Sequence, residues 1–187
     1  MTCVLALRTP RGILMASDSI ECAGPEASTL RVADAKLFRV AGMLAGSSGS
    51  TRVAQLLRFA RLPTAKGTTR DLVRTLVPAI RRAIERGGHV APPKDDDGEP
   101  SQAAMDGDLL LAVRGSIFRV NSDLSVTSST REYDAVGVGA AWATGSLYTT
   151  RDTKLSPERR VTLALEASAE HCALVRGPWV IKWARRK

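Results

Sequence analysis

The chain begins MTCVLAL (residues 1–7), and this stretch is the clearest guide to its fold. After Thr2 every residue of the stretch is apolar, so the strand that it predicts has two apolar faces. One face carries Val4 and Ala6, and the other carries Cys3, Leu5 and Leu7. A strand of this kind is buried on both of its faces.

Thr2 has two interpretations. In one, it is a polar residue at the start of a buried strand. In the other, methionine aminopeptidase removes Met1 because a small residue follows it, and Thr2 then carries a free α-amino group beside its own hydroxyl. An α-amino group has a pKa of about 7.7–8.0, which suits a general base at neutral pH. The second interpretation makes Thr2 a candidate nucleophile.

The composition is that of a globular protein. Of the 187 residues, 44% are hydrophobic and 25% are charged, which predicts one domain with a substantial core. No apolar run approaches the roughly 18 residues that span a bilayer, and no secretory signal is evident. We therefore expect a cytoplasmic protein with no membrane partner. Cys3, Cys22 and Cys172 have no metal-like spacing, so we expect reduced thiols and neither a metal nor a cofactor.

The net charge of +8 comes from 27 basic and 19 acidic residues, which raises the question of a polyanionic partner. The basic residues are spread over several segments, and only 4% of residues are aromatic, so few side chains could stack on bases. We therefore favour solvated helix faces as the explanation and expect no nucleic-acid partner.

Strand and helix signals follow one another in runs. The N-terminal part is predicted to form hairpins over 2–18 and 35–47, with a loop over 22–28 between them, and then helices over 49–62 and 68–88. An exposed loop insertion is predicted over 88–106. It is followed by strands over 108–113, 116–121, 125–128 and 133–139, helices over 140–150 and 156–174, and a strand over 178–184. This order predicts an α+β fold in which sheets stack on each other with helices outside.

Two of these helices have clear boundary signals and apolar stripes. Thr68 with Asp71 forms a box-like cap, Gly87 can end the same helix, and Pro78 is expected to kink it. The expected apolar stripe of this helix is Leu72, Val73, Leu76, Ile80 and Ile84. The helix over 156–174 starts with a Ser cap at Ser156 and with Pro157 at its first helical position, and its stripe is Val161, Ala164, Leu165, Ser168 and Cys172.

Histidine, the commonest catalytic base, is nearly absent. His89 lies in the polar loop and His171 lies near the end of a helix, and neither belongs to a Ser-His-Asp, Cys-His or metal-binding motif. A hydrolase with this sequence therefore needs another base, and the amine of Thr2 is a suitable group.

Several stretches, taken in order, resemble one known family. They are the N-terminal Thr-plus-strand, ASDS (16–19), DAKLFRV (34–40), LAGSSGST (44–51), YDAVGVGAAWATG (133–145) and LALEASAEHC (163–172). Together they resemble the proteasome β-subunit and its bacterial relative HslV, which are N-terminal nucleophile (Ntn) hydrolases. The resemblance covers almost the whole chain. It implies a four-layer αββα sandwich with two antiparallel sheets between helix layers.

The resemblance also implies catalytic roles. Thr2 would attack a peptide carbonyl while its own amine, through a water, takes the proton. Lys36 would lower the pKa of the Thr2 hydroxyl, and Asp18 would hold Lys36 charged and oriented. The backbone N–H of Gly46 would stabilise the oxyanion.

Two supporting positions depart from the family pattern. The Gly-x-Gly turn of the family commonly carries Ser at its centre, where it bonds the N-terminal amine, and the matching residue here is Val138. The family also has an Asp near the end of the penultimate helix, and the ungapped match here is Glu170.

The resemblance places a substrate pocket as well. Leu44 and Ser48 would lie beside the substrate residue that precedes the cut, with Glu21 and Arg52 at the rim. Their mixed chemistry predicts no strong preference for one residue type.

The resulting expectation is a threonine-type endopeptidase subunit of a self-compartmentalising ring. It would form a homo-oligomeric ring or stacked rings and cleave unfolded polypeptide. HslV works with an AAA+ unfoldase and some bacterial relatives have no known one, so the resemblance leaves open whether an AAA+ unfoldase is a partner. No extended propeptide precedes Thr2, so removal of Met1 would be the only activation step. The alternative is a catalytically silent shell subunit, because Val138 cannot support the amine.

Overall fold

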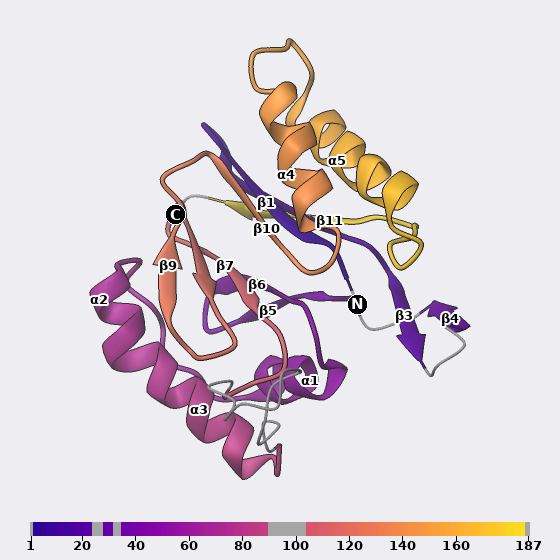
Figure 1. Ribbon diagram of the computed structural model, residues 1–187. Helices are drawn as coiled ribbons and strands as arrows, with labels where there is room; N and C mark the ends of the chain where they lie inside the picture. Colours follow the sequence, from indigo (N-terminus) through magenta and orange to yellow (C-terminus); the bar gives the residue numbers. More distant parts are fainter. Residues whose placement is uncertain (1, 24–27, 32–34, 90–103, 186–187) are drawn as a thin grey trace.

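The computed structural model describes residues 2–23, 28–31, 35–89 and 104–185 (Figure 1). The strands are β1 (Val4–Thr9), β2 (Gly12–Ser17), β3 (Ile20–Ala23), β4 (Ser28–Arg31), β5 (Leu37–Val40), β6 (Met43–Ser47), β7 (Leu109–Val113), β8 (Ser116–Val120), β9 (Val126–Ser128), β10 (Tyr133–Val136) and β11 (Val180–Arg185). The helices are α1 (Thr51–Phe59), α2 (Thr69–Asp71), a π-helical turn (Leu72–Leu76), α3 (Val77–Arg86), α4 (Ala140–Thr149) and α5 (Pro157–His171).

Most strands belong to two antiparallel sheets. The first sheet has the order β10-β1-β2-β11, and the second is the meander β5-β6-β7-β8-β9. Each neighbouring pair is antiparallel. Helices α4 and α5 cover the first sheet and α1 to α3 cover the second, which gives the layers helix, sheet, sheet and helix (Figure 1).

Strand β1 is buried on both faces, as the alternation of its side chains predicted. Leu5 and Leu7 pack in a core with α4 and α5. Val4 and Ala6 point the other way and pack between the two sheets, in a core that also contains Leu44 of β6. All of these side chains are fully buried. The inner position of β1 holds its N-terminal end between the layers.

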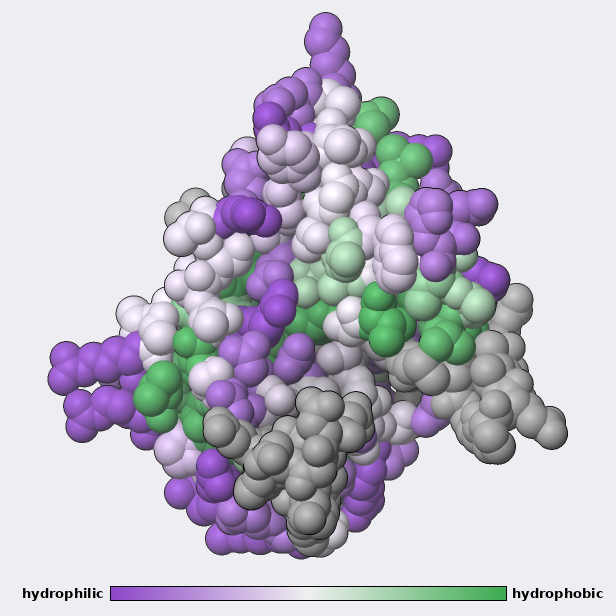
Figure 2. Space-filling model, in the orientation of Figure 1, coloured by the Kyte–Doolittle hydropathy of each residue, from purple (hydrophilic) through white to green (hydrophobic). Residues whose placement is uncertain are grey.

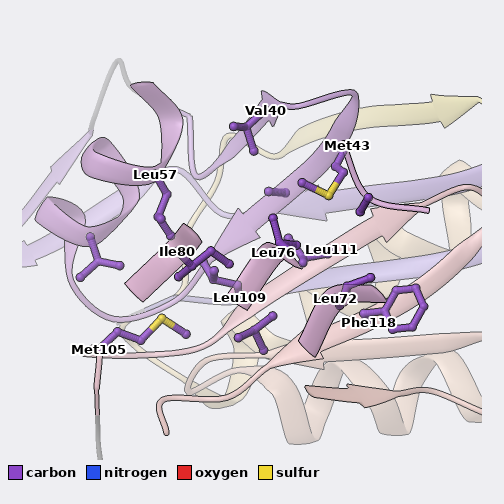
Figure 3. Close-up of a cluster of buried hydrophobic side chains, with 14 of the residues drawn as sticks. Val40, Met43, Leu57, Leu72, Leu76, Ile80, Met105, Leu109, Leu111 and Phe118 are labelled. Carbon is purple, nitrogen blue, oxygen red and sulfur yellow. The ribbon is translucent and has the colours of Figure 1, made fainter. Parts of the chain in front are cut away.

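A third core joins the second sheet to its helices. Figure 3 shows side chains of β5, β6, β7 and β8 meeting those of α1, the π-helical turn and α3. The labelled residues are Val40, Met43, Leu57, Leu72, Leu76, Ile80, Met105, Leu109, Leu111 and Phe118. This core supports, from the helix side, the sheet that contains Gly46 and begins directly after Lys36.

The helix predicted over 68–88 has the expected boundaries and an irregular middle. The hydroxyl of Thr68 accepts a hydrogen bond from the N–H of Asp71, and Gly87 forms the C-terminal cap. A π-helical turn precedes Pro78, which has no N–H to donate. The wider turn changes the helical register, and the expected burial of Val73 is wrong because this side chain is exposed.

Two other expectations differ from the structure. The predicted loop over 22–28 overlaps the ends of strands β3 and β4, which pair as an additional hairpin. Most of the exposed loop predicted over 88–106 lies outside the described residues, and at its end Met105 is buried in the core instead of exposed.

The surface agrees with the expected solvated helix faces. In Figure 2 the end of the molecule formed by α2 and α3 is predominantly hydrophilic. Arg81, Arg82 and Arg86 are exposed on α3, together with the acidic Glu85. None of the helices in the described ranges is long and apolar enough to cross a membrane.

Candidate active site

Thr2 is separated from β1 by Cys3 alone and is buried, with 3% of its surface exposed. Its carbonyl oxygen accepts a hydrogen bond from the N–H of Gly139, at 3.3 Å. In the sequence its nitrogen forms a peptide bond with Met1, so the amine is free only when Met1 has been removed. The strand interpretation and the nucleophile interpretation of Thr2 are therefore compatible.

Asp18 and Lys36 form a buried ion pair beside this strand end. The Lys36 Nζ lies 2.8 Å from Oδ2 and 3.0 Å from Oδ1 of Asp18. The Asp18 side chain is fully buried, and 12% of the Lys36 side chain is exposed. Asp18 follows β2 and Lys36 precedes β5, so the pair joins the two sheets. The sequence prediction that these two residues interact is in agreement with this geometry.

The same carboxylate holds the backbone next to Thr2. Oδ1 of Asp18 accepts from the N–H of Cys3 at 3.0 Å, and Oδ2 accepts from the N–H of Ile20 at 3.4 Å. The N–H of Asp18 donates to the Cys3 carbonyl at 3.2 Å. Burial raises the pKa of the Asp18 carboxyl, and the Lys36 ammonium and the two N–H donors oppose this rise.

Gly46 lies within β6, at a point where the two sheets approach closely. A Cβ atom at this position would lie 2.5 Å from the Val4 side chain and 2.7 Å from the Leu37 side chain. Both neighbours are core residues, so glycine is required here for packing.

The N–H of Gly46 does not have the orientation that the sequence led us to expect. Successive N–H groups of an antiparallel strand point to opposite neighbours. The N–H of Ser47 donates to the Lys36 carbonyl, next to β5, and that of Ser48 donates to the Asp108 carbonyl, next to β7. The N–H of Gly46 therefore points to β7, within the plane of its own sheet, and away from β1 in the other sheet.

The turn between β10 and α4 lies against the other side of Thr2. Gly137 has a φ of 94°, and a Cβ atom on it would lie 2.2 Å from the Thr2 carbonyl oxygen, so only glycine fits. The same Cβ would lie 3.4 Å from the Ser48 side chain, which brings the end of β6 to this turn. Val138, at the centre of the turn, is 44% exposed and has no polar side-chain atom.

A buried serine, not singled out from the sequence as a site residue, lies behind this turn. The Ser168 hydroxyl is 3.0 Å from the Gly139 carbonyl oxygen and 2.8 Å from that of Ala164, and it lies 3.6 Å from the Cys3 thiol. The sequence contains one signal that could have identified Ser168, because it is a polar residue in a helix stripe that is otherwise largely apolar. Glu170, the residue expected to provide support from this helix, is exposed.

The expected pocket residues have different environments. Leu44 is fully buried between the sheets. Ser48 is 8% exposed, and its Oγ accepts from the N–H of Asp108 at 3.0 Å. Glu21 accepts a hydrogen bond from the Thr51 hydroxyl, and the neighbouring Arg52 donates to the Gly87 carbonyl at 3.2 Å. Glu21 and Arg52 thus lie around the start of α1, next to Ser48.

Two further features bear on the chemistry. An open pocket of about 640 Å³ is lined by residues from α4 and from the segment that enters β10, and it contains none of the candidate catalytic side chains.

Across the described part of the chain, no group of three or more His, Cys, Asp or Glu residues could hold a metal ion.

Comparison with known proteins identifies the fold. No protein-family model matches the sequence, and no curated protein matches it. Among solved structures, BPH from Thiobacillus denitrificans in complex with epoxomicin is similar at a TM-score of 0.81 with 19% identity, covering 99% of both chains. Eukaryotic HslV from Trypanosoma brucei is similar at 0.67 with 14% identity, covering 96% of this chain and 97% of that one.

Anbu, an ancestral β-subunit, from Yersinia bercovieri is similar at a TM-score of 0.67 with 15% identity, over 96% of this chain and 80% of that one. These likenesses extend over nearly the whole chain. They confirm the expected architecture: the chain has the αββα sandwich fold that it shares with BPH, HslV and Anbu.

Proposed function

We propose that the chain is a threonine peptidase subunit in which Thr2 is the nucleophile. The observation that carries this proposal is the buried Asp18–Lys36 ion pair, whose carboxylate also binds the N–H of Cys3. A charged pair at the boundary between two apolar layers has a large desolvation cost, so a purely structural role is a weak explanation for it. Its connection to the residue after Thr2 places it beside the candidate nucleophile.

The proposed reaction begins when Met1 has been removed. The Thr2 hydroxyl attacks a peptide carbonyl, and the free α-amine, through a water molecule, takes the hydroxyl proton. The positive charge of Lys36 stabilises the negative charge that develops on the hydroxyl oxygen, and Asp18 keeps the ammonium in place. The covalent ester to Thr2 is then hydrolysed by water, with the amine again as the base.

For the oxyanion we propose the N–H of Gly49 in place of that of Gly46. Gly49 lies between β6 and α1, next to Ser48, whose side chain borders the turn that contacts Thr2. Its N–H donates to no acceptor among the residues that the structure describes. It also lies close to the N-terminus of α1, where the partial positive charge of the helix favours an anion.

We further propose assembly into a homo-oligomeric ring or stacked rings, which encloses the site and restricts it to unfolded polypeptide. Support comes from the fold shared with HslV and Anbu. An AAA+ unfoldase is the proposed partner that would deliver substrate. Ser48, Glu21 and Arg52 are the proposed residues of the substrate pocket and its rim. Leu44, which the sequence led us to expect beside the substrate, is fully buried between the sheets and is not proposed as a contact.

Intact-mass spectrometry tests the nucleophile directly. Purified protein should lack Met1, and incubation with epoxomicin, the compound found in the BPH complex, should add one inhibitor mass per chain. Peptide mapping should place the adduct on Thr2. Thr2→Ala should abolish the adduct and the cleavage of small peptides, whereas Thr2→Ser, which retains a hydroxyl, should keep part of both. A folded protein that has lost Met1 and forms no adduct on Thr2 contradicts the proposal.

A second candidate, a catalytically silent shell subunit, is favoured by one observation. Val138 presents an exposed apolar side chain at the position where the resemblance calls for a hydroxyl that supports the amine. This candidate predicts rings without hydrolysis and no difference between the native chain and Thr2→Ala in peptide cleavage. Particle size measured together with the adduct therefore separates the two candidates.

A further inference from the structure

We infer that Ser168 is a positioning residue for the proposed nucleophile and acts through the turn between β10 and α4. The inference rests on the proposed function of Thr2. It identifies a side chain of α5 that orders the turn at Val138, where the resemblance led us to expect a serine within the turn itself.

The contacts of Ser168 form a continuous path to Thr2. Its hydroxyl lies 3.0 Å from the carbonyl oxygen of Gly139, and the N–H of Gly139 donates to the carbonyl of Thr2 at 3.3 Å. A second path passes through the thiol of Cys3, which lies 3.6 Å from the same hydroxyl. Ser168 therefore contacts both the residue that holds Thr2 from the turn and the residue that follows Thr2 in the chain.

The packing around Ser168 shows that this contact is tightly constrained. Ser168 is fully buried. A Cβ atom on Gly139 would lie 2.8 Å from the Cβ of Cys3 and 3.1 Å from that of Ser168, so α5, the turn and β1 approach each other as closely as a glycine allows. The Gly139 carbonyl oxygen also accepts from the N–H of Ala143 in α4, at 3.1 Å, so the Ser168 hydroxyl adds a contact from α5 to a carbonyl that α4 already holds.

Hydrogen bonding accounts for each polar atom in this path. A serine in a helix commonly bonds the carbonyl four residues earlier, which here is that of Ala164, at 2.8 Å. The hydroxyl has one proton, which it shares between this carbonyl and that of Gly139 at 3.0 Å, and the second acceptor connects the helix to the turn. The Cys3 thiol can donate to the Ser168 oxygen, and burial raises the pKa of this thiol to about 11, so it keeps its proton.

The experiment compares Ser168→Ala with Thr144→Val as a matched control. The Thr144 hydroxyl donates to the carbonyls of Ala140 and Ala141 within its own helix, so its removal deletes a helix back-bond without touching the turn. Two measurements are made on both variants: hydrogen exchange of the peptide that contains Gly139, and the rate of epoxomicin addition to Thr2 as a function of inhibitor concentration.

If Ser168 positions Thr2, Ser168→Ala raises the exchange rate of the Gly139 amide by roughly 3- to 10-fold, because the turn that carries this amide loses its hydrogen bond to α5. It also lowers the maximal rate of epoxomicin addition by about 10-fold or more, with a half-saturating concentration changed by no more than about twofold. Thr144→Val changes none of these quantities.

Three results have distinct meanings. Unchanged exchange at Gly139 in Ser168→Ala overturns the inference, whether or not the protein is active. Faster exchange with an unchanged maximal rate also overturns it, because Ser168 is then structural only. If the native protein, with Met1 removed, forms no adduct on Thr2, the proposed function fails, and faster exchange in Ser168→Ala alone would still support the path from α5 to the strand end.

Discussion

On one side of Thr2 lie a buried carboxylate and an ammonium group, and on the other lies a turn that contributes only backbone groups. On the charged side, the Asp18–Lys36 pair connects the two sheets at 2.8 and 3.0 Å, and the Asp18 carboxylate also accepts from the N–H groups of Cys3 and Ile20 at 3.0 and 3.4 Å. The turn side contacts Thr2 through the N–H of Gly139 and through the close approach of Gly137.

The difference shows how one strand end can be held by two kinds of interaction. The charged side depends on complementary side chains, so the loss of either partner leaves the other buried without compensation. The turn side depends on the absence of side chains at two glycines and on a single hydroxyl from α5. We expect substitutions on the charged side to have the larger effects.

The largest effect is expected for Lys36→Met, which leaves Asp18 buried without its cation. We expect the free energy of unfolding to fall by about 3–5 kcal/mol, with loss of epoxomicin addition. Urea denaturation at neutral pH measures the change. Lys182→Met is the control. Among the described residues the Lys182 ammonium bonds only the Leu37 carbonyl, and its pKa is lowered by burial and by Arg58 and Arg39. The comparison fails if the two variants lose similar stability.

The next effect concerns the turn side and depends on pH. Burial raises the pKa of Cys3 from 9.0 to about 11. Above pH 9 the unfolded chain loses this proton while the folded chain keeps it, so folding stability declines as the pH rises from about 9 to about 11. The expected decline is about 2–3 kcal/mol.

Denaturation of the native chain and of Cys3→Ala at several pH values isolates this contribution. The difference in free energy of unfolding between the two proteins should be constant below pH 9 and should shift by the stated amount by pH 11. A constant difference over the whole range would show that the thiol ionises equally well in the folded state.

A smaller effect is expected for Gly46→Ala, at the point where the sheets meet below Thr2. The new Cβ would lie 2.5 Å from the Val4 side chain, and we expect a loss of about 1–3 kcal/mol from overpacking. Gly145→Ala is the matched control, because a Cβ on Gly145 meets no atom within 4 Å. In α4 that change should stabilise the protein by about 0.5–1 kcal/mol. Equal effects at both glycines would contradict the close packing of the sheets.

The smallest change in stability is expected for Val138→Ser, which introduces the hydroxyl that the resemblance calls for at this position. Val138 is half-exposed, so the free energy of unfolding should change by less than about 0.5 kcal/mol. Peptide cleavage or epoxomicin addition should become faster if a hydroxyl at this position supports the amine, and Val138→Ala should have no such effect. An equal rate for both variants would mean that the turn supports Thr2 through its backbone alone.

Much of the fold was predictable because it depends on local patterns. The alternation in β1, the cap at Thr68 and the serine cap before α5 all act within a few residues, and each is confirmed. The hairpin of β3 and β4 was missed because glycine and proline between these strands favour a loop assignment. The burial of Val73 was wrong because a π-helical turn changes the helical register, which a regular period of 3.6 residues does not anticipate.

The sequence by itself determined the strand that carries Thr2, its two apolar faces and the residue types of the ion pair. Only the tertiary structure decided which groups meet Thr2, since these contacts join residues that are far apart in the chain. It showed that Gly46 is required for packing between the sheets, and that Ser168, and not Glu170, reaches the glycine turn. The physical reason is that the spacing of apolar residues along the chain predicts which face of a strand or helix a side chain lies on. Its hydrogen-bond partner depends on how closely the sheets and helices approach one another in the folded protein.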